Sequence, residues 1–553
     1  YFNAVRTVEN ALSKVKDEKG MKRIEKFLTK GPCPACHGTR FNERALSTKL
    51  MGKNIAEVCA MTLSELVVWV QKIPGQMPSE IEEMAQSIVN EFLRTAERLT
   101  NLGLSYLSLD RAGSTLSNGE LQRVQISRAV RSDTTGVLYV LDEPSIGLHP
   151  YNVDGLMKIV RELVDRKNSV VLVDHDPRIL MDADQLIEIG PGAGKEGGRI
   201  VTQGTPLEAE KNPHSLIGPY LSGKESLKVR SRATEKDMFE NGSIRIKTKP
   251  FYTVKALDVS IPKGRMIAVT GVSGSGKTSL VIECLVPALQ AVIQGTKLPE
   301  HVDSIEAKGI QSVKVIDSKP IGANVRSTVA TYDGGFDDLR KLFARTADAK
   351  AKGLTAGDFS YNTGKLRCPV CDGTGIITMD VQFLPDVDTI CPSCGGSRYG
   401  KDAYDILWKS KEKDSVSVSL PGLLKLTVEE AAGILHEETK IAKQLKILQD
   451  LGVCYLTLGE ATPALSGGEA QRLKLAYEME TPQQGSVFVF DEPTIGLHPQ
   501  DVKKLVLIFD HLIQLGATVI VIEHDLELVT NCDYIIDMGP WGGTEGGRVV
   551  VEG

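Results

Sequence analysis

The distribution of apolar residues along this chain predicts a mixed α/β protein. Apolar positions at helical spacing predict amphipathic helices within residues 1–30 and 55–102. Other stretches are short, almost purely apolar runs, typical of strands buried on both faces of a parallel sheet. These runs lie at residues 137–141, 170–173, 266–270 and 487–490. The polar, charged stretch from about 206 to 243 is interpreted as a linker, with a basic DNA-facing strap as the alternative.

Two stretches repeat each other at a constant offset, which is 349 positions from Ser117 to Ser466. The register holds without an insertion to the end, where Gly204 corresponds to Gly553. The chain is therefore built from two related halves. The counterpart of the segment 271–278 would fall about 72 positions before Tyr1. We therefore expect this chain to be part of a longer protein.

Composition narrows the class of protein. The 553 residues, 41% of them hydrophobic, suffice for roughly three to four packed domains. No run of about 18 apolar residues occurs, so we expect no membrane span. The net charge of −6 gives no overall attraction to nucleic acid, so DNA binding would need a local basic surface. Six of the ten cysteines lie in Cys-Pro-x-Cys pairs, which favours zinc over disulfides and a reducing, cytoplasmic location.

Segment 271–278 fits the phosphate-binding pattern G-x-x-x-x-G-K-[ST], between an apolar strand and an apolar helix. Its glycines let backbone N–H groups approach phosphate oxygens, while Lys277 reaches the β and γ phosphates and the Thr278 hydroxyl binds Mg²⁺. We therefore predict an ATP site. Its expected residues are Gly271, Ser273, Gly274, Ser275, Gly276, Lys277, Thr278 and Ser279.

An Asp-Glu pair ends an apolar strand in each half. Carboxylates at strand ends are where such sheets present ligand groups. Asp142 and Asp491 are predicted to hold Mg²⁺ through water, and Glu143 and Glu492 to act as general bases toward the attacking water. In each half a histidine follows after a further apolar strand and is predicted to contact the γ-phosphate. These histidines are His175 and His524.

The spacing Cys368-x2-Cys371-x19-Cys391-x2-Cys394 predicts a structural Zn²⁺ site, because two such knuckles bring four thiolates into tetrahedral reach. Four cysteine ligands leave no open coordination position. Cys33 and Cys36 form a similar knuckle with no second pair nearby, so their zinc partners would lie outside this chain or include His37.

The sequences Leu-Ser-x-Gly-Glu, Asp-Glu-Pro and the later histidine are similar to the signature, Walker B and H-loop motifs of ATP-binding-cassette ATPases. In that family the P-loop of one half is closed by the signature of the other half. The resemblance implies one complete site, made of Lys277, Asp491, Glu492 and His524 facing Ser117, Asn118 and Gly119. A second site would use Asp142, Glu143, His175, Ser466, Gly467 and Gly468, and its P-loop is not in this chain.

Three positions affect how that site is expected to work. Asn118 replaces the glycine found at Gly467, and its side chain would crowd a ligand near the backbone. Ser318 stands where the family usually has a glutamine that touches Mg²⁺ and couples it to the inserted domain. Tyr252 is interpreted either as an adenine-stacking residue or as a packing residue.

Cassette motifs interrupted by a Cys₄ module resemble the UvrA family, the damage-sensing ATPase of bacterial nucleotide excision repair. Further matching segments are 327–332, 359–362, 391–399 and 190–194. The resemblance implies an α/β fold with two cassette halves, inserted helical signature domains and Cys₄ zinc modules. It also implies an ATPase that is not itself a nuclease, a homodimer, and binding to double-stranded, preferentially damaged DNA. The segment that docks UvrB in the family is not expected in this chain.

Residues 308–367 hold eleven Lys or Arg against six Asp, a local excess suited to phosphate contacts without sequence reading. The expected DNA contacts are Arg326, Arg340, Lys341 and Arg345.

The expected domains are a first signature domain with a zinc knuckle (1–103), the rest of half I (104–222), a linker (223–243), the P-loop part of half II (244–307), a second signature domain with the Cys₄ module (308–450), and the rest of half II (451–553). Three other functions remain open. They are a UvrA-like paralogue that protects DNA against a drug, a DNA-bound scaffold that binds ATP but hardly hydrolyses it, and a transporter cassette, which the zinc tetrad argues against.

Overall fold

The computed structural model describes residues 31, 33–116, 118–130, 134–145, 148, 150–192, 197–223, 229–319, 321–322, 324–379, 387–410, 416–479 and 483–553. It divides into two compact units, each described by itself: Tyr1–Ala96 with Leu107–Thr115, and Glu97–Tyr106 with Leu116–Gly553. None of the helices within these residues is both long and apolar enough to cross a membrane.

The first unit is mostly helical. Its elements are α3 (Glu43–Leu46), β1 (Lys49–Leu50), β2 (Lys53–Asn54), α4 (Ile55–Cys59), α5 (Leu63–Val70), a short 3₁₀ turn (Pro74–Gln76) and α6 (Ser79–Asn101), whose last residues belong to the second unit. Asn54 and Thr62 begin α4 and α5 with capping boxes, as their side chains accept the N–H of Glu57 and Glu65. A small apolar core of Leu66, Val70 and Val89 joins α5 to α6.

The main sheet of the second unit has six strands in the order β11-β16-β17-β9-β18-β19. These are β11 (Ser312–Ile316), β16 (Ser486–Asp491), β17 (Thr518–Ile522), β9 (Met266–Gly271), β18 (Tyr534–Gly539) and β19 (Arg548–Glu552). All neighbouring pairs are parallel except β18 with β19. A second, antiparallel sheet contains β7 (Ser243–Thr248), β8 (Asp258–Pro262) and β10 (Val302–Glu306). The strands predicted at 266–270 and 487–490 are confirmed.

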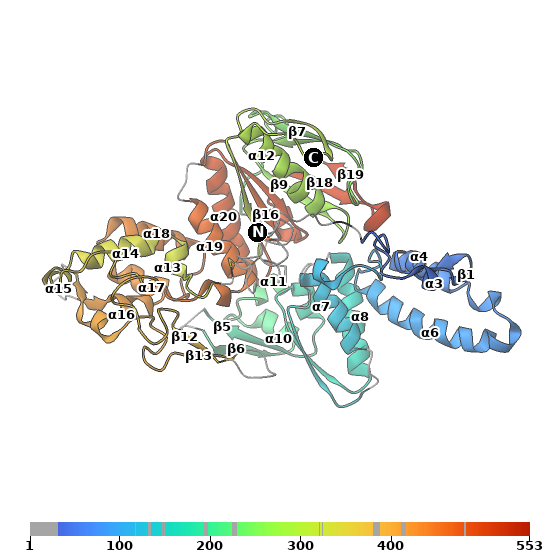
Figure 1. The fold of residues 1–553 in the computed structure, drawn as a ribbon, viewed down its shortest axis with the longest axis horizontal. Coiled ribbons are helices and arrows are strands. Elements are labelled where there is room, and N and C mark those ends of the chain that lie inside the picture. The colour runs from blue at the N-terminus through green and yellow to red at the C-terminus, as the bar shows by residue number, and fades with distance from the viewer. Residues whose placement is uncertain are drawn as a thin grey trace, which may run out of the picture. The chain divides into compact units, whose positions relative to one another are not determined.

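Alternation along each strand places helices on both faces of this sheet (Figure 1). Ile267 and Val269 pack with a π-helix (Ser279–Leu285) and α12 (Val286–Gln294). Met266 and Ala268 share the opposite core with α19 (Gly467–Met479) and α20 (Pro499–Gln514). Helix α21 (Leu526–Val529) follows β17. We call this body half II.

Half I repeats α19, β16, α20, β17, α21, β18 and β19 in the register of the sequence repeat, and α10 and α11 follow them. It contains α7 (Asn118–Ala129), β3 (Leu138–Asp142), α8 (Pro150–Asp165), β4 (Ser169–Val173), α9 (Pro177–Met181), β5 (Leu186–Gly190), β6 (Arg199–Gly204), α10 (Pro206–Lys211) and α11 (Gly218–Leu221). Its strands form two separate pairs, β3 with β4 and β5 with β6. The predicted strands at 137–141 and 170–173 are confirmed.

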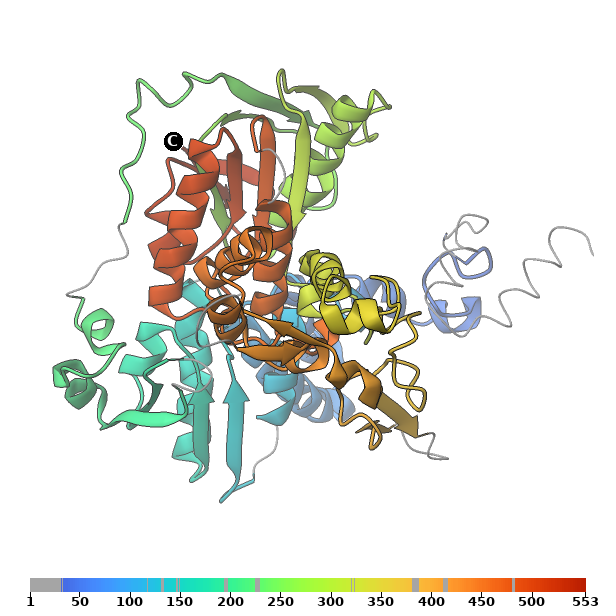
Figure 2. The same ribbon diagram turned by 90° about the vertical axis from the view of Figure 1, so that its left-hand side faces the viewer.

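A helical insertion lies between β11 and α19. Its elements are α13 (Val329–Tyr332), α14 (Gly335–Ala344), α15 (Ala347–Ala351), β12 (Ile376–Met379), β13 (Val387–Ile390), a 3₁₀ turn (Lys401–Asp405), β14 (Leu407–Lys409), β15 (Ser417–Ser419), α16 (Leu420–Leu424), α17 (Val428–Ile434) and α18 (Thr439–Asp450). In Figure 2 the β12–β13 hairpin, in yellow-brown, projects from these helices.

The expected linker is only partly a linker. Residues 206–221 include α10 and α11, which belong to half I. Arg230 is buried and forms ion pairs with Asp510 (2.9 Å) and Asp533 (3.0 Å) of half II. A guanidinium held by two buried or half-buried carboxylates does not face DNA, so the basic-strap alternative is wrong for Arg230. Lys224 and Lys228 lie outside the described residues.

Candidate nucleotide and metal sites

The phosphate-binding loop runs from the end of β9 into the helix that begins at Ser279. A side chain at Gly271 would come within 2.0 Å of the carbonyl of Met538, and both Gly271 and Gly276 have positive φ, so the loop needs glycine there. Lys277 Nζ donates to the carbonyls of Gly271 (2.7 Å) and Val272 (3.0 Å). Ser275 is buried, and its hydroxyl has no hydrogen-bond partner within the described part of the chain. This unused donor, together with the exposed Thr278, fits the binding of a phosphate chain.

The acidic pair of half II stands at the end of β16. Burial, with the nearby carboxylates of Glu492 and Asp317, raises the pKa of Asp491 to about 7. A bound divalent cation would favour the ionised carboxylate and so offset this cost. Glu492 has a φ of 48°, a conformation rare for a residue with a side chain, and His524 Nδ1 lies 3.8 Å from Glu492 Oε1.

Half I has the same arrangement at its own acidic pair. Glu143 has a φ of 45°, and His175 Nδ1 lies 4.0 Å from Glu143 Oε1. Burial raises the pKa of Glu143, while His175 opposes this shift. The same strained backbone at both glutamates indicates that the geometry belongs to the motif rather than to its surroundings.

The start of α7 in half I lies against the phosphate-binding loop of half II. The Tyr106 hydroxyl donates to Glu120 and lies 3.3 Å from Ser273 Oγ, and Arg123 also donates to Ser273 Oγ (3.4 Å). A side chain at Gly274 would meet the Tyr106 ring at 2.9 Å. Gly119 lies in the first turn of α7, whereas Ser117 and the side chain of Asn118 lie outside the described residues. The structure thus brings the first signature region to Ser273 and Gly274 of the phosphate-binding loop.

The second signature segment lies within half II. A side chain at Gly467 would press on Ser318 at 3.3 Å, and one at Gly468 on the carbonyl of Ile495 at 3.2 Å. Ser466 precedes them at the start of α19, where its hydroxyl accepts the N–H of Glu469. The loop after Glu492 reaches half I, because a side chain at Gly496 would lie 3.2 Å from the Glu143 carboxylate. Gln122 Nε2 donates to the carbonyl of Asp142 at the end of β3.

Sequence reasoning missed an acidic residue before each histidine. Asp174 accepts hydrogen bonds from the hydroxyl and N–H of Ser145 and from the N–H of the histidine that follows it. Glu523 accepts the same bonds from Thr494 and from its own following histidine. Each acid therefore ties the loop after the strand-end glutamate to the histidine loop. The constant offset, which pairs Asp174 with Glu523, was the available signal.

It also missed a tyrosine in each half. Tyr455 donates to Glu469 (2.7 Å) as Tyr106 does to Glu120. Only Tyr106 also touches the phosphate-binding loop. Tyr252, for its part, is 80% exposed and has a φ of 49°, and its ring centroid lies 4.3 Å from that of Phe251, so stacking on adenine stays a prediction.

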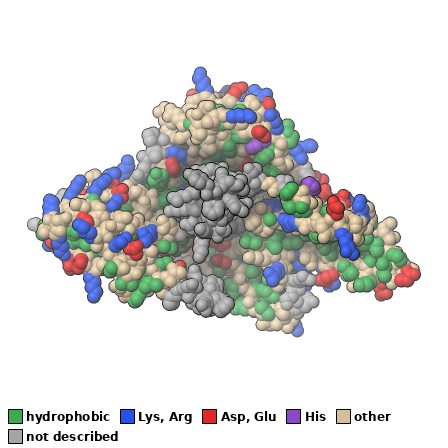
Figure 3. Space-filling model, viewed as in Figure 1, with side chains coloured by type: hydrophobic (Ala, Val, Ile, Leu, Met, Phe, Trp, Pro, Cys, Tyr) green, Lys and Arg blue, Asp and Glu red, His purple; other side chains and the backbone are tan. Residues whose placement is uncertain are grey.

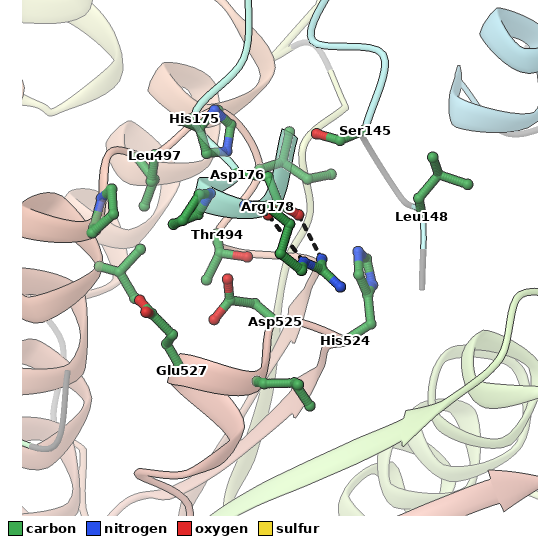
Figure 4. Close-up of a pocket in the computed structure, with 16 residues that line it drawn as sticks. Ser145, Leu148, His175, Asp176, Arg178, Thr494, Leu497, His524, Asp525 and Glu527 are labelled. Atoms are coloured by element: carbon green, nitrogen blue, oxygen red, sulfur yellow. Dashed lines mark hydrogen bonds and ion pairs between the residues drawn. The ribbon is translucent and has the colours of Figure 1, made fainter. Parts of the chain in front are cut away.

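A cavity of about 270 Å³ lies between the two histidine loops. Figure 4 shows His175 and His524 reaching it from different halves, with the ion pair of Arg178 and Asp176 between them (2.5 Å). The offset pairs Arg178 with Glu527, which also lines the cavity. Burial, with Asp525 and Asp176 nearby, raises the pKa of Glu527 to about 7. The wall is therefore nearly symmetric in sequence but asymmetric in charge.

The four cysteines of the predicted zinc site come together at the base of the β12–β13 hairpin. The ligand atoms of Cys368, Cys371, Cys391 and Cys394 all lie within 4.8 Å of one another. The sulfur atoms of Cys371 and Cys394 are 3.7 Å apart, as expected for thiolates that share a tetrahedral Zn²⁺. Burial opposes ionisation, but backbone N–H groups of Cys371 and Val370 lower the pKa of Cys368 to about 7. The geometry and the donor set fit zinc.

Cys33 and Cys36 differ from that tetrad. Within the described residues no third His, Cys or carboxylate joins them in a metal-binding group. Cys33 is exposed, and hydrogen bonds from the N–H groups of Cys36 and Ala35 lower the pKa of its thiol. Zinc at this pair stays a prediction.

The basic residues expected to contact DNA are largely paired with carboxylates. Arg326 donates to the carbonyl (3.0 Å) and the carboxylate of Asp372, which directly follows Cys371 of the cysteine tetrad. Arg340 pairs with Asp337 and Lys341 with Asp338. Arg345 is exposed, and the described residues give it no ion pair. Figure 3 accordingly shows Lys and Arg interspersed with acidic side chains over the lobe of α13–α18.

Known proteins resemble this chain in sequence and in structure. No family model matches the sequence. The chain is 41% identical over 536 residues to UvrABC system protein A of Staphylococcus aureus (strain COL), covering 96% of this chain and 55% of that protein. It is 40% identical over 542 residues to the protein of that name from Thermus thermophilus, covering 97% and 56%. The crystal structure of UvrA2 from Deinococcus radiodurans superposes with a TM-score of 0.89 at 35% identity, covering all of this chain and 67% of that one. The chain thus spans about half the length of the curated relatives it matches.

Proposed function

We infer that this chain, which belongs to the UvrA family, binds and hydrolyses ATP at a site formed by both of its halves. The fold is that of ATP-binding-cassette ATPases, and the Cys₄ cluster is consistent with a zinc module. The observation that carries the proposal is the contact of Tyr106 and Arg123 with Ser273 of the phosphate-binding loop. This contact supports a composite site in which the first signature region closes the phosphate-binding loop of half II.

Each side chain of this site has a distinct role. Lys277 would hold the β and γ phosphates, and the Thr278 hydroxyl and, through water, Asp491 would hold Mg²⁺. When bound, Mg²⁺ neutralises charge that develops on the phosphate oxygens. Glu492 takes a proton from the attacking water, and His524, held by the Glu523 carboxylate through its N–H, faces the same position. Glu523 and Asp174 position these loops without touching substrate.

Steady-state ATP hydrolysis by the wild type and by Glu492→Gln tests this function. We expect the variant to lose about 10²–10⁴-fold in rate, the usual contribution of a general base. Glu143→Gln is the matched change in half I and should lower the rate much less. Comparable losses in both variants would show that hydrolysis does not depend on the half II site.

We further propose that the protein senses damage in double-stranded DNA during nucleotide excision repair, as a cytoplasmic homodimer that couples ATP use to DNA loading. The relatives are named UvrABC system protein A, which supports this role. The family resemblance also implies UvrB as a partner of the whole protein. Binding to several duplexes with and without a bulky lesion tests the proposal. Strong preference for one undamaged sequence, or no stimulation of ATP hydrolysis by damaged DNA, would contradict it.

A second candidate is a DNA-bound protein that binds ATP and hardly turns it over. Ser318 favours it, since it replaces the metal-touching glutamine that the family resemblance leads one to expect. Tight ATP binding with a rate no higher than that of Glu492→Gln would identify this function. A UvrA-like paralogue that protects DNA against a drug would instead hydrolyse ATP without supporting excision.

A further inference from the structure

One lysine holds the loop after β11 against the second signature helix. Lys474 Nζ donates to the carbonyls of Asp317 (2.9 Å) and Lys319 (2.8 Å) and to the carboxylate of Asp317 (2.5 Å). The Lys474 side chain is only 14% exposed. The Lys474 ammonium group therefore uses all three of its hydrogen-bond donors on one short loop.

The loop held in this way borders the acidic pair of half II. Strands β11 and β16 are parallel neighbours with Ile316 opposite Phe490, so Asp317 and Asp491 leave the sheet side by side. Gln471, on the same face of α19 one turn earlier, donates to the carbonyls of both Ile316 and Asp491 (3.1 Å each). Helix α19 thus fixes the loop and the predicted magnesium ligand relative to each other.

Ser318 makes the position of this loop important for the predicted magnesium site. Its side chain is much shorter than the glutamine expected there, and it packs against the start of α19, close to Gly467. The position of the loop backbone and of the Asp317 carboxylate therefore determines which groups would lie next to the predicted Mg²⁺. Without Lys474, the Asp317 carboxylate beside Asp491 would keep the exposed Lys319, at 3.7 Å, as its cationic partner among the described residues, and two loop carbonyls would lose their donor.

We propose that Lys474 is a positioning residue for ATP hydrolysis, because it fixes and neutralises the Asp317–Lys319 loop beside the magnesium-binding carboxylate. The proposal rests on the function proposed above for the same site. It is specific to half II, since the counterpart of Lys474 in half I is the exposed Gln125. Gln125→Met is therefore the matched control for Lys474→Met.

The test is a Mg²⁺ titration of steady-state ATP hydrolysis, with thermal unfolding of every variant measured alongside. For Lys474→Met we expect kcat to fall about 10-fold, KM for ATP to change less than about 3-fold, and the half-saturating Mg²⁺ concentration to shift by at least about 3-fold. Lys474→Arg should restore most of kcat, and Gln125→Met should behave as wild type. Asp317→Asn should remove most of the effect of Lys474→Met, because the two changes act on one interaction.

An unchanged Mg²⁺ dependence in Lys474→Met would overturn the proposal, as would losses in Lys474→Met and Asp317→Asn that simply add. Failure of the proposed function is recognised separately, by equal rates in wild type and Glu492→Gln. In that case, Mg²⁺-dependent binding of a fluorescent ATP analogue decides about Lys474. A shifted Mg²⁺ dependence in Lys474→Met supports the positioning role, and an unshifted one removes it.

Discussion

Half I and half II share one sequence register but differ in what covers their strands. Val489 in β16 is fully buried, whereas its counterpart Val140 in β3 is 63% exposed. Met538 and Ile189 differ in the same way, at 1% and 69%. In half II, β9 pairs with both β17 and β18, and the helix after it packs on the sheet. No described strand does this in half I, whose four strands form two separate pairs.

This difference separates strand formation from strand burial. The apolar runs of β3 and β4 form strands in the same register as β16 and β17, because local pattern and cross-strand hydrogen bonds suffice for that. Burial depends on neighbours that the strand itself does not encode. Half I therefore has its acidic pair and histidine in the correct strained geometry while its strand faces remain exposed.

The largest predicted difference is in zinc binding, between the cysteine tetrad and the Cys33–Cys36 pair. Cys371→Ser should abolish zinc binding at the tetrad, because a structural Cys₄ site contributes roughly 10–16 kcal/mol that three ligands do not match. Cys36→Ser, in the pair upstream of half I, should leave one zinc per chain. Zinc content of the purified variants gives the answer. Loss of zinc in Cys36→Ser would show that the first pair also holds metal.

The next contrast is in the cores. Val489→Ala should lower the free energy of unfolding by about 2 kcal/mol, through lost burial and a small cavity. Val140→Ala, the same change at the counterpart position, should cost less than about 0.5 kcal/mol. Urea unfolding of both variants measures the difference. Equal losses would show that the exposed face of half I is covered in solution.

The paired tyrosines test which signature faces the phosphate-binding loop. Tyr106→Ala should lower kcat/KM for ATP about 10-fold, since it removes a ring against Gly274 and a hydroxyl near Ser273. Tyr455→Ala should change it less, because the Tyr455 hydroxyl donates to its own signature glutamate, Glu469, and meets no described residue of the phosphate-binding loop. A larger effect of Tyr455→Ala would contradict the proposed composite site.

The smallest contrast lies in the cavity between the histidine loops. The pKa of Glu527 is raised from its usual 4.5 to about 7. Both folded and unfolded states bind the proton below pH 4.5, whereas only the folded state keeps it between 4.5 and 7, so the ionisation of Glu527 destabilises the fold increasingly up to pH 7. Glu527→Gln should therefore raise Tm at pH 8 and leave it nearly unchanged at pH 4.5.

Arg178→Gln is the control for that experiment, since Arg178 occupies the counterpart position and its pair with Asp176 is half-exposed. It should lower stability by at most about 1 kcal/mol at both pH values. A stabilising effect of Glu527→Gln that is equal at pH 4.5 and pH 8 would rule out the titration of Glu527 as its cause.

Much of the site follows from local sequence. The strand before Gly271, the four cysteines and the repeated acidic pairs were all predictable, because each depends on residues close together in the chain or on a constant offset. Family membership also followed from motifs whose spacing is local. The roles predicted for the nucleotide-site and zinc residues stay predictions, and the experiments above test them.

Contacts between distant segments were not predictable in this way. Arg230 looked like a free basic residue until the structure placed two aspartates beside it, both from the last part of the chain. The excess of Lys and Arg in 308–367 suggested a DNA surface, yet Arg326 pairs with Asp372, 46 positions further along the chain, whereas Arg340 and Lys341 pair with acids one helical turn before them. Net charge counts residues, whereas a binding surface depends on which of them remain unpaired.

The sequence by itself determined which elements form, where the loop glycines lie and which cysteines come together, because backbone sterics and ligand spacing act over short distances. Tertiary structure alone decided that Tyr106 faces Ser273 and that Lys474 holds Asp317. These outcomes depend on packing between segments far apart in the chain. A local sequence pattern does not determine which surfaces of two distant segments come into contact.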